Sequence, residues 1–363
     1  MSALLIADFL PIVAVGLVLG PLVDRWSRRA LLIVSDVARF GVFCLLPFAD
    51  HPATLVGLAF LAGVATGFFR PAVYAGLPNL VSDEDLPEAN SLLQAVENLA
   101  WTIGPVLGGI LVAAEGPGLA YWLNAATFLV SAVLLVRIPA GRLQAGAVES
   151  RGHWQDVGDG IRLVLRSRPL LTVLVVWNVA LLGSASINVA EIVLAKVSLD
   201  AGDAGFGVLV GATGLGLTLG SLLAPQLLDR LGTRGAYSGS LALMGVGIGI
   251  AAVAPAIWVA VVGVIVGAVG NGAAVVANAL LVQRGAPDEL RGRAFTVIMS
   301  SNYVVLGLAM VAAGGLVDAF GGRWIFGGAS IAFLLAAVTA AVLARGVGQA
   351  EEPQLEEVLA SRV

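Results

Sequence analysis

The chain has 363 residues, of which 58% are hydrophobic and only 12% are charged, and its mean hydropathy is +0.95. This composition excludes a soluble globule, which needs far more polar surface, and predicts a protein whose surface is solvated by lipid. The net charge of -4 gives no indication of a nucleic-acid partner, and one cysteine with two histidines excludes an internal disulfide and a Cys/His metal cluster.

Eleven apolar runs follow one another along the chain, each near the roughly 20 residues that cross about 30 Å of hydrocarbon. They lie at 3–22, 30–48, 54–80, 89–114, 116–136, 169–193, 203–228, 236–254, 256–283, 294–317 and 324–344. We therefore predict an all-α integral membrane protein with eleven transmembrane helices.

One connector, 137–168, is longer than the others and carries six arginines. It predicts a division of the chain into an N-terminal transmembrane bundle (1–136) and a C-terminal transmembrane bundle (169–345), with 137–168 as a cytoplasmic linker. The polar, glutamate-rich residues 346–363 are expected to form a cytoplasmic tail.

A charged motif after the first run recurs in the second half of the chain. GPLVDRWSRR at 20–29 resembles PQLLDRLGTR at 225–234, about 204 residues later, and the connectors at 79–91 and 283–295 also correspond. Such a repeat indicates two structurally similar halves, which is how many secondary transporters are built. The motif residues are Gly20, Asp24, Arg25, Arg28 and Arg29 in the first copy and Asp229, Arg230 and Arg234 in the second.

The basic residues predict the orientation of the chain, because Lys and Arg gather in short cytoplasmic loops. If the loop at 23–29 is cytoplasmic, the connectors on its side and the tail hold sixteen of the twenty Lys and Arg residues. Arg39 and Arg70 lie within apolar runs, which leaves Lys196 and Arg323 on the other side. We therefore expect a multi-pass protein of the cell (inner) membrane with a cytoplasmic C-terminus.

The two motif copies, together with GPVLGG at 104–109 and the segment at 68–92, resemble a major facilitator superfamily (MFS) transporter of the twelve-helix drug and siderophore exporter type. The resemblance covers nearly the whole chain and implies two pseudo-symmetric six-helix bundles. The family places the first motif after its second helix, so the eleven runs correspond to its second to twelfth helices. We expect the first helix to be encoded upstream of Met1, with a shortened chain as the alternative.

The resemblance implies a mechanical role for the first motif. The carboxylate of Asp24 is expected to accept hydrogen bonds from the free amides of a helix that begins near Ala294, and so to latch the two halves. Arg25, Arg28 and Arg29 are placed for ion pairs and for lipid headgroups. An anchoring role of these charges is compatible with the latch.

The motif GPVLGG resembles the antiporter motif of the family. Pro105 removes a backbone donor and bends the helix, while Gly104, Gly108 and Gly109 admit close backbone approach. Ordinary small-residue packing is the alternative to a role in the direction of transport. Other GxxxG spacings, such as Gly216 with Gly220, carry little weight in a chain with 46 glycines.

Ionisable side chains within hydrocarbon are costly and tend to face a cavity or a partner. Arg70 lies near the middle of its run and shares a helix face with Gly67 and Tyr74. Arg70 and Tyr74 are therefore candidates for the substrate path, with a structural salt bridge of Arg70 as the alternative. Asp36 and Arg39, three residues apart, are expected to pair with each other.

Glu97 is the candidate proton carrier. It lies roughly 12 Å inside the membrane at about 1.5 Å per residue, whereas His51 and His153 both fall in connectors. A Glu97 that only joins helices by hydrogen bonds is the alternative.

A second polar stripe lies on the run at 169–193, where Ser184, Asn188 and Glu191 recur at helical spacing. Glu191 lies near the outer interface, so simple solvation is the alternative to a role in transport. Asn271 and Asn278 are further candidates for the substrate or proton path.

The function is predicted from these features and by exclusion. The single lysine, Lys196, is followed by Val197, so a phosphate-binding loop of the Walker type is absent from the sequence. We predict a secondary active transporter that exports small amphipathic or hydrophobic molecules by proton antiport with alternating access. A non-transporting, truncated or sensor-like protein of the same fold is the alternative. The expected partners are a small-molecule substrate, protons and the lipid bilayer; a monomer is expected, with no cofactor, no metal and no enzymatic activity.

Overall fold

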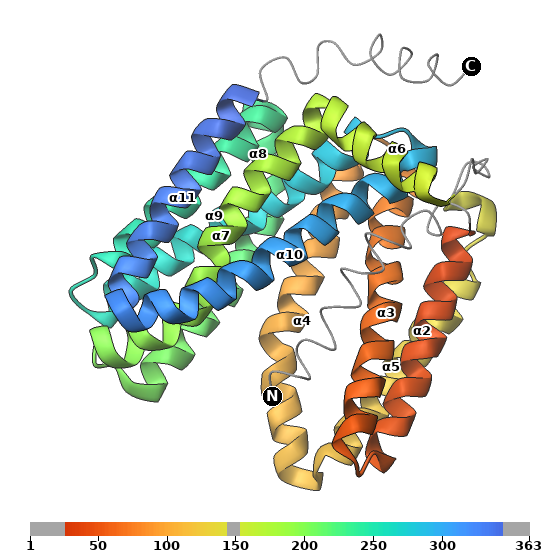
Figure 1. Cartoon of the computed structure of the whole chain (residues 1–363), viewed down its shortest axis with the longest axis horizontal. Coiled ribbons are helices and arrows are strands. Elements are labelled where there is room, and N and C mark those ends of the chain that lie inside the picture. Colours follow the sequence, from red (N-terminus) through yellow and green to blue (C-terminus); the bar gives the residue numbers. More distant parts are fainter. Residues whose placement is uncertain (1–25, 144–152, 344–363) are drawn as a thin grey trace. The chain divides into compact units, whose positions relative to one another are not determined.

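A computed structural model describes residues 26–143 and 153–343, and every regular element in these two ranges is helical (Figure 1). The first motif residues Gly20, Asp24 and Arg25 lie outside the described residues, as do the run at 3–22 and the tail. The long helices are α2 (Arg28–Leu45), α3 (Pro52–Gly76), α4 (Leu86–Glu115), α5 (Pro117–Val136), α6 (His153–Arg166), α7 (Arg168–Val193), α8 (Gly202–Ala252), α9 (Ile257–Gly285), α10 (Asp288–Phe320) and α11 (Gly322–Leu343). The short 3-10 helices are η1 (Leu46–Phe48), η2 (Leu77–Asn79) and η3 (Ala140–Arg142), and a π-helical turn, η4 (Leu194–Ser198), extends α7.

Nine of the described helices are long and apolar enough to cross a membrane. They coincide with the expected runs from 30–48 onward, and α8 contains two of these runs, 203–228 and 236–254. The backbone of α8 breaks at Gly232, where φ is 66° and ψ is 167°. An L residue rarely adopts such angles, so a glycine marks the junction between the two spans. The prediction of an all-α integral membrane fold is confirmed.

One helix was not expected from hydropathy. α6 occupies the second part of the predicted linker 137–168 and has a strongly amphipathic pattern rather than an apolar one. Its Gly160 packs against α10, where a Cβ at this glycine would lie 3.2 Å from the Cβ of Arg293. The second part of the linker is therefore a regular helix.

The chain forms two compact units. Unit 1 comprises the residues up to Asn90, Val96–Leu163 and Pro287–Gly307; unit 2 comprises Ser91–Ala95, Val164–Ala286 and the residues from Leu308 onward. Helices α4 and α10 thus contribute residues to both units. The division into bundles at 1–136 and 169–345 stays a prediction.

In unit 1, α2 packs against α3 and against α5 (Figure 1). Leu31, Leu32 and Ala72 form a buried cluster with Leu143, which follows η3. The predicted pair of Asp36 and Arg39 is confirmed, with 2.6 Å between Arg39 Nη2 and Asp36 Oδ1. The Arg39 guanidinium also lies over the ring of Phe69, 4.2 Å from its centroid.

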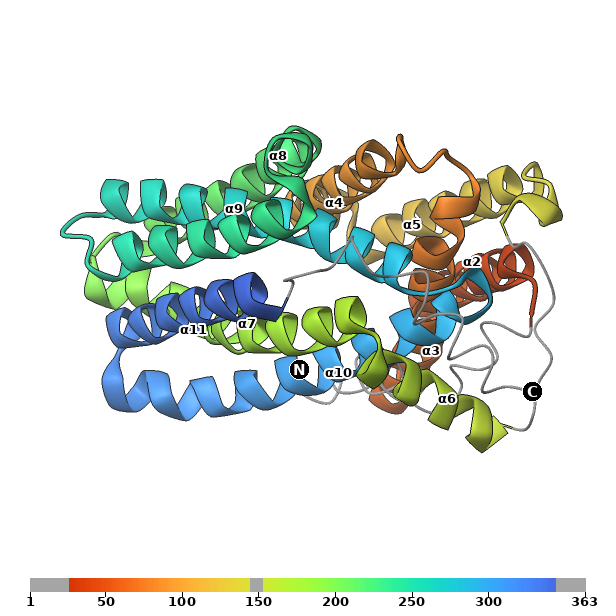
Figure 2. The same ribbon diagram turned by 90° about the horizontal axis from the view of Figure 1, so that it is seen from above.

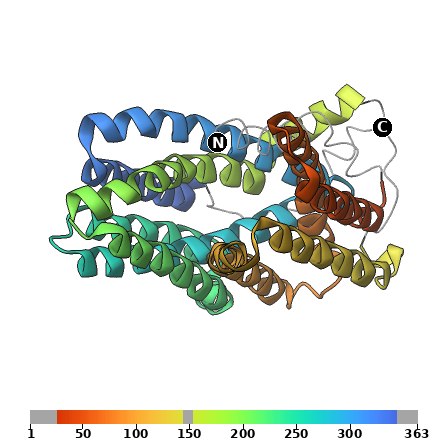
Figure 3. The same cartoon turned by 90° about the horizontal axis from the view of Figure 1, so that it is seen from below.

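In unit 2, α8 packs along α9 and α11, and α7 packs along α11 (Figures 2 and 3). Glycines make the contact between α8 and α9 close. A Cβ at Gly216 would lie 2.6 Å from the Cβ of Ala268, and a Cβ at Gly220 would overlap the carbonyl group of Val269. The spacing of these two glycines, which carried little weight in the sequence, therefore marks a helix contact.

Candidate functional site

An ion pair joins α3 to α4 within unit 1. Arg70 Nη2 lies 2.6 Å from Glu97 Oε2, and the two side chains are 35% and 26% exposed. Arg70 Nη1 also donates a hydrogen bond to the hydroxyl of Tyr303 on α10 over 3.3 Å. Arg70 was a candidate for the substrate path and Glu97 for the proton path, and the structure brings the two together.

Tyr74 completes this group one turn beyond Arg70 on α3. Its hydroxyl donates to Glu97 Oε2 over 3.5 Å, and its ring packs against Phe295 of α10 with 5.6 Å between centroids. Glu97 thus has a cation and a hydroxyl within reach of the same carboxylate oxygen. Glu97 therefore joins α3 to α4 through both Arg70 and Tyr74.

A second polar group surrounds the first turn of α2. The guanidinium of Arg28 is 1% exposed and lies 2.7 Å from Asp288 Oδ1 at the start of α10. Its Nη1 also donates to the carbonyl oxygens of Ala75 and Leu143 over 3.1 and 3.0 Å. Arg28 therefore connects three segments that are distant in the sequence.

Asp288 receives further donors. Asn79 Nδ2 and Arg291 Nη1 each lie 2.9 Å from Asp288 Oδ1. Asp288 was not a candidate site residue, although it is the repeat counterpart of Glu84 in the sequence. The contact expected from the resemblance joined Asp24 to a helix beginning near Ala294, whereas α10 begins at Asp288 and its first turn contacts Arg28.

The last arginine of each motif copy contacts the end of a helix. Arg29 donates to the carbonyl oxygens of Leu135 and Val136, at the end of α5. Arg234 Nη2 donates to the carbonyl oxygen of Ala341, in the last turn of α11, over 2.6 Å. Asp229 and Arg230 are exposed on α8.

The antiporter-like motif lies in the middle of α4. Pro105 is inside the helix, which continues to Glu115. A Cβ at Gly104, Gly108 or Gly109 would meet no atom within 4 Å in the described part of the chain. Close backbone approach at these glycines is therefore not seen among the described residues.

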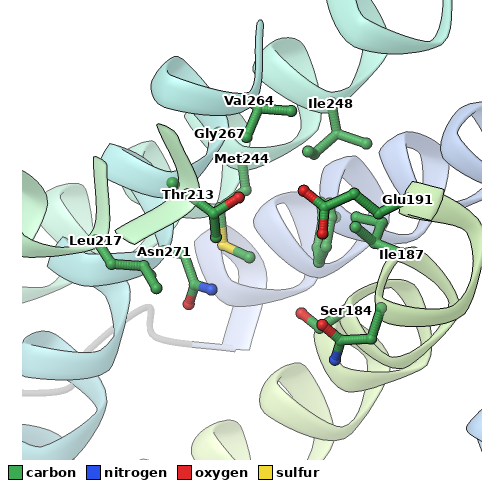
Figure 4. Close-up of a pocket in the computed structure, with 13 residues that line it drawn as sticks. Ser184, Ile187, Glu191, Thr213, Leu217, Met244, Ile248, Val264, Gly267 and Asn271 are labelled. Atoms are coloured by element: carbon green, nitrogen blue, oxygen red, sulfur yellow. The ribbon is translucent and has the colours of Figure 1, made fainter. Parts of the chain in front are cut away.

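Unit 2 contains a cavity of about 180 Å³ between α7, α8, α9 and α11, which we call the Glu191 pocket (Figure 4). Its walls mix polar and apolar side chains. They are Ser184, Ile187, Asn188, Glu191, Thr213, Leu217, Met244, Ile248, Val264, Gly267, Ala268, Asn271 and Phe333.

The predicted stripe of Ser184, Asn188 and Glu191 lies along one wall of this pocket, and Asn271 lies on another. Asn278, two turns further along α9, lies outside the lining. The Thr213 hydroxyl lies near the Glu191 carboxylate and donates a hydrogen bond to the carbonyl oxygen of Leu209 over 3.1 Å. Glu191 is half-buried, and its Oε1 atom is buried and has no hydrogen-bond partner among the described residues.

Comparison with known proteins places the sequence in a group of membrane transporters. The family described as "MFS_3: Transmembrane secretion effector" matches residues 1–358. The multidrug efflux pump Tap of Mycolicibacterium fortuitum is 28% identical over 360 residues, which is 95% of this chain and 87% of that protein. The uncharacterized MFS-type transporter YfiS of Bacillus subtilis is 28% identical over 352 residues, 92% of this chain and 80% of that protein.

Shorter and more distant similarities agree with these. The putative bacilysin exporter BacE of Bacillus amyloliquefaciens is 27% identical over 171 residues, 44% of this chain and 43% of that protein. The crystal structure of the human organic anion transporter MFSD10 has a TM-score of 0.79 at 15% identity and covers 93% of this chain and 83% of that one. The crystal structure of a bacterial homologue of the iron transporter ferroportin, in an outward-facing state, has a TM-score of 0.75 at 19% identity. The match covers 94% of this chain and 89% of that one.

Proposed function

Because the chain belongs to the major facilitator superfamily, in its family of transmembrane secretion effectors, we propose that it is a secondary active exporter of small amphipathic molecules. The superfamily consists of transporters, so the chain is a multi-pass membrane transporter and not an enzyme. Export is supported by the relatives, since Tap carries the name of a multidrug efflux pump and BacE that of a putative bacilysin exporter.

The observation that carries the proposal further is the ion pair of Arg70 and Glu97. Both residues lie within helices long and apolar enough to span the membrane, where an ionised side chain needs a partner. When Glu97 takes up a proton, it no longer balances the charge of Arg70. We propose that this step couples transport to the proton gradient. In each cycle the Glu97 carboxylate would pair with Arg70 in one state and carry a proton in the other.

The contacts of Arg28 support a role for the start of α10 in alternating access. Asp288 at this position accepts hydrogen bonds from α2, from η2 and from α10 itself. In the proposal this polar group forms a latch that is closed in one state of the cycle and open in the other, because its members come from separate segments. Asp24, which the resemblance also assigns to the latch, should then lose transport as Asp24→Asn while membrane insertion is unchanged.

The proposed location is the cell (inner) membrane, with the C-terminus in the cytoplasm. This orientation is supported by the distribution of Lys and Arg, because most of these residues lie in connectors on the same side of the membrane as the 137–168 segment, and such residues gather on the cytoplasmic side. The proposed unit of transport is a single copy of the chain.

An efflux assay tests the proposed function. The full-length protein is expressed in bacteria that lack their own efflux pumps, and the retention of a panel of fluorescent and antibiotic compounds is measured with and without a protonophore. We expect lower retention of at least one amphipathic compound, and we expect the protonophore to abolish the difference. Unchanged retention across the panel, with the protein present in the membrane, would contradict export.

A further inference from the structure

The Glu191 pocket contains an uncompensated acidic group. Among its lining residues, all of which are described, Glu191 is the only one with an ionisable side chain. Thr213 approaches the carboxylate, but the Oε1 atom is buried without a partner. A buried polar atom without a partner costs free energy, and the few that occur in native proteins call for an explanation, such as an unseen ion or ligand.

The polar groups around this oxygen define the chemistry of a ligand. Glu191 when ionised accepts hydrogen bonds only, while Ser184, Asn188 and Asn271 can each accept one through a hydroxyl or an amide oxygen. A primary ammonium group offers three N–H donors and one positive charge. It would satisfy Glu191 Oε1 and still have donors for the neighbouring oxygens.

The rest of the pocket is apolar. Its walls include Leu217, Ile248, Val264 and Phe333, which come from three different helices. Its volume of about 180 Å³ is close to that of an engineered apolar cavity of about 150 Å³ that binds benzene. The pocket therefore has room for an ammonium group with one ring or a short alkyl chain, and a larger molecule would extend beyond it.

We infer that the Glu191 pocket binds the protonated amine of an exported molecule, with the ammonium on Glu191 and the attached apolar group against Leu217, Ile248 and Phe333. This inference rests on the proposed function and names its substrate class, a hydrophobic primary amine. The inference assigns different roles to the two carboxylates. Glu97 in unit 1 pairs with Arg70, whereas Glu191 in unit 2 would bind the cation of the substrate.

Protection of a pocket cysteine tests the inference on the purified full-length protein in lipid nanodiscs. Cys44→Ala removes the natural thiol, and Ser184→Cys places a new one in the lining of the pocket. The rate of its reaction with uncharged N-ethylmaleimide is measured with three probes. Benzylammonium carries both charge and ring, ethylbenzene carries the ring alone, and ammonium chloride carries the charge alone.

We expect benzylammonium to slow the labelling of the new cysteine roughly tenfold near saturation. In Glu191→Gln the apparent Kd of benzylammonium should rise at least about tenfold, because the variant loses one charge-assisted hydrogen bond to the ligand. Ethylbenzene and ammonium chloride should each protect far less. Glu115→Gln, at the exposed end of α4, is the matched control and should leave the protection unchanged. The thermal stability of the Cys44→Ala protein with the same probes gives a second readout that does not depend on the new cysteine.

Three outcomes would overturn the inference. Equal protection by ethylbenzene would make the pocket an apolar site, equal protection in Glu191→Gln would place the amine elsewhere, and no protection by any probe would leave Glu191 as a site for a proton alone. Because these measurements do not depend on transport, protection without efflux would contradict the proposed function while supporting the pocket.

Discussion

Arg29 and Arg234, at equivalent positions of the two motif copies, make the same contact: each guanidinium donates to carbonyl oxygens in the last turn of a helix, α5 for Arg29 and α11 for Arg234. The last carbonyl groups of a helix have no partner within it, and a cation nearby also interacts favourably with the helix dipole. The repeat is therefore visible in a side-chain contact within each unit as well as in the sequence. It also explains why an arginine closes each motif copy, since a shorter polar side chain could not reach the neighbouring helix.

These two contacts should have similar energies. We expect Arg29→Ala and Arg234→Ala each to lower the free energy of unfolding by about 0.3–1 kcal/mol, the usual contribution of a cation at an exposed helix end. Chemical denaturation in detergent, followed by circular dichroism, measures both variants. Arg230→Ala, on the exposed surface of α8 in the same motif copy, serves as the control. A large loss in one variant and none in the other would contradict the equivalence.

The buried contact of Arg28 should be far more costly to remove. Arg28→Ala removes the nearest cation of Asp288, which keeps Arg291, and it also removes a donor from the carbonyl oxygens of Ala75 and Leu143; hydrogen bonds that involve a charged group typically contribute about 1.5–3 kcal/mol. We expect a clear drop in the midpoint of thermal unfolding in detergent and a loss of efflux. Arg137→Ala, at an exposed position after α5, should change neither. A stable Arg28→Ala protein with normal efflux would show that the group around Asp288 is not a latch.

The proposed coupling predicts the behaviour of Glu97→Gln. The amide keeps the shape of the carboxyl group but cannot release a proton, so proton-driven efflux should fall at least about tenfold while substrate binding and passive exchange persist. Efflux is measured in proteoliposomes with an imposed pH gradient. Efflux that follows the gradient as in the wild type would leave Glu97 as a structural residue, and Glu115→Gln controls for a general effect of removing a carboxylate from α4.

An exchange of charges separates the structural part of this ion pair from the coupling part. Arg70→Glu and Glu97→Arg should each reduce the amount of folded protein, because each places two like charges within hydrogen-bonding distance. The double variant restores opposite charges. We expect it to recover folding, measured as monodisperse protein after purification, but not proton-driven efflux. Full recovery of efflux would show that the pair matters only for packing.

The glycines of unit 2 and of α4 should respond differently to an added methyl group. Gly220→Ala forces apart the backbones of α8 and α9, and overpacking of this kind typically costs about 1–3 kcal/mol. Gly108→Ala meets no described atom and should leave the unfolding midpoint nearly unchanged. Thermal unfolding of both variants checks the difference, and a destabilised Gly108→Ala protein would indicate that α4 packs against a residue outside the described ranges.

Hydropathy predicts the spans of this protein well, because crossing lipid constrains the length and polarity of each helix. The boundary between the two spans of α8 is an example. The connector predicted between the runs 203–228 and 236–254 contains Gly232, where the helix breaks. Hydropathy missed α6 because an amphipathic helix has no apolar run. Its pattern of apolar residues could have revealed it.

The site was harder to predict, because helix periodicity shows which residues share a face but not which faces meet. Arg70 and Glu97 were each identified as ionisable residues in a span, yet their contact depends on how α3 lies beside α4. Arg28 was expected to form ion pairs or to contact lipid headgroups, but its partner Asp288 lies 260 positions away in the sequence and could not be named from it. The sequence placed Glu191 on a polar stripe but could not show its neighbours. The fold shows that residues of α8, α9 and α11 line the pocket that contains it.

Gly232 is exposed, lies outside the Glu191 pocket and belongs to neither polar group of unit 1. A saturation screen interpreted by charge, size or burial would rank it with the tolerant surface positions. Its backbone angles give the opposite ranking, because every replacement adds a Cβ to a conformation that is almost confined to glycine. Alanine, serine and aspartate should therefore be nearly equally damaging there, and the codon for this exposed residue should accept almost no missense change.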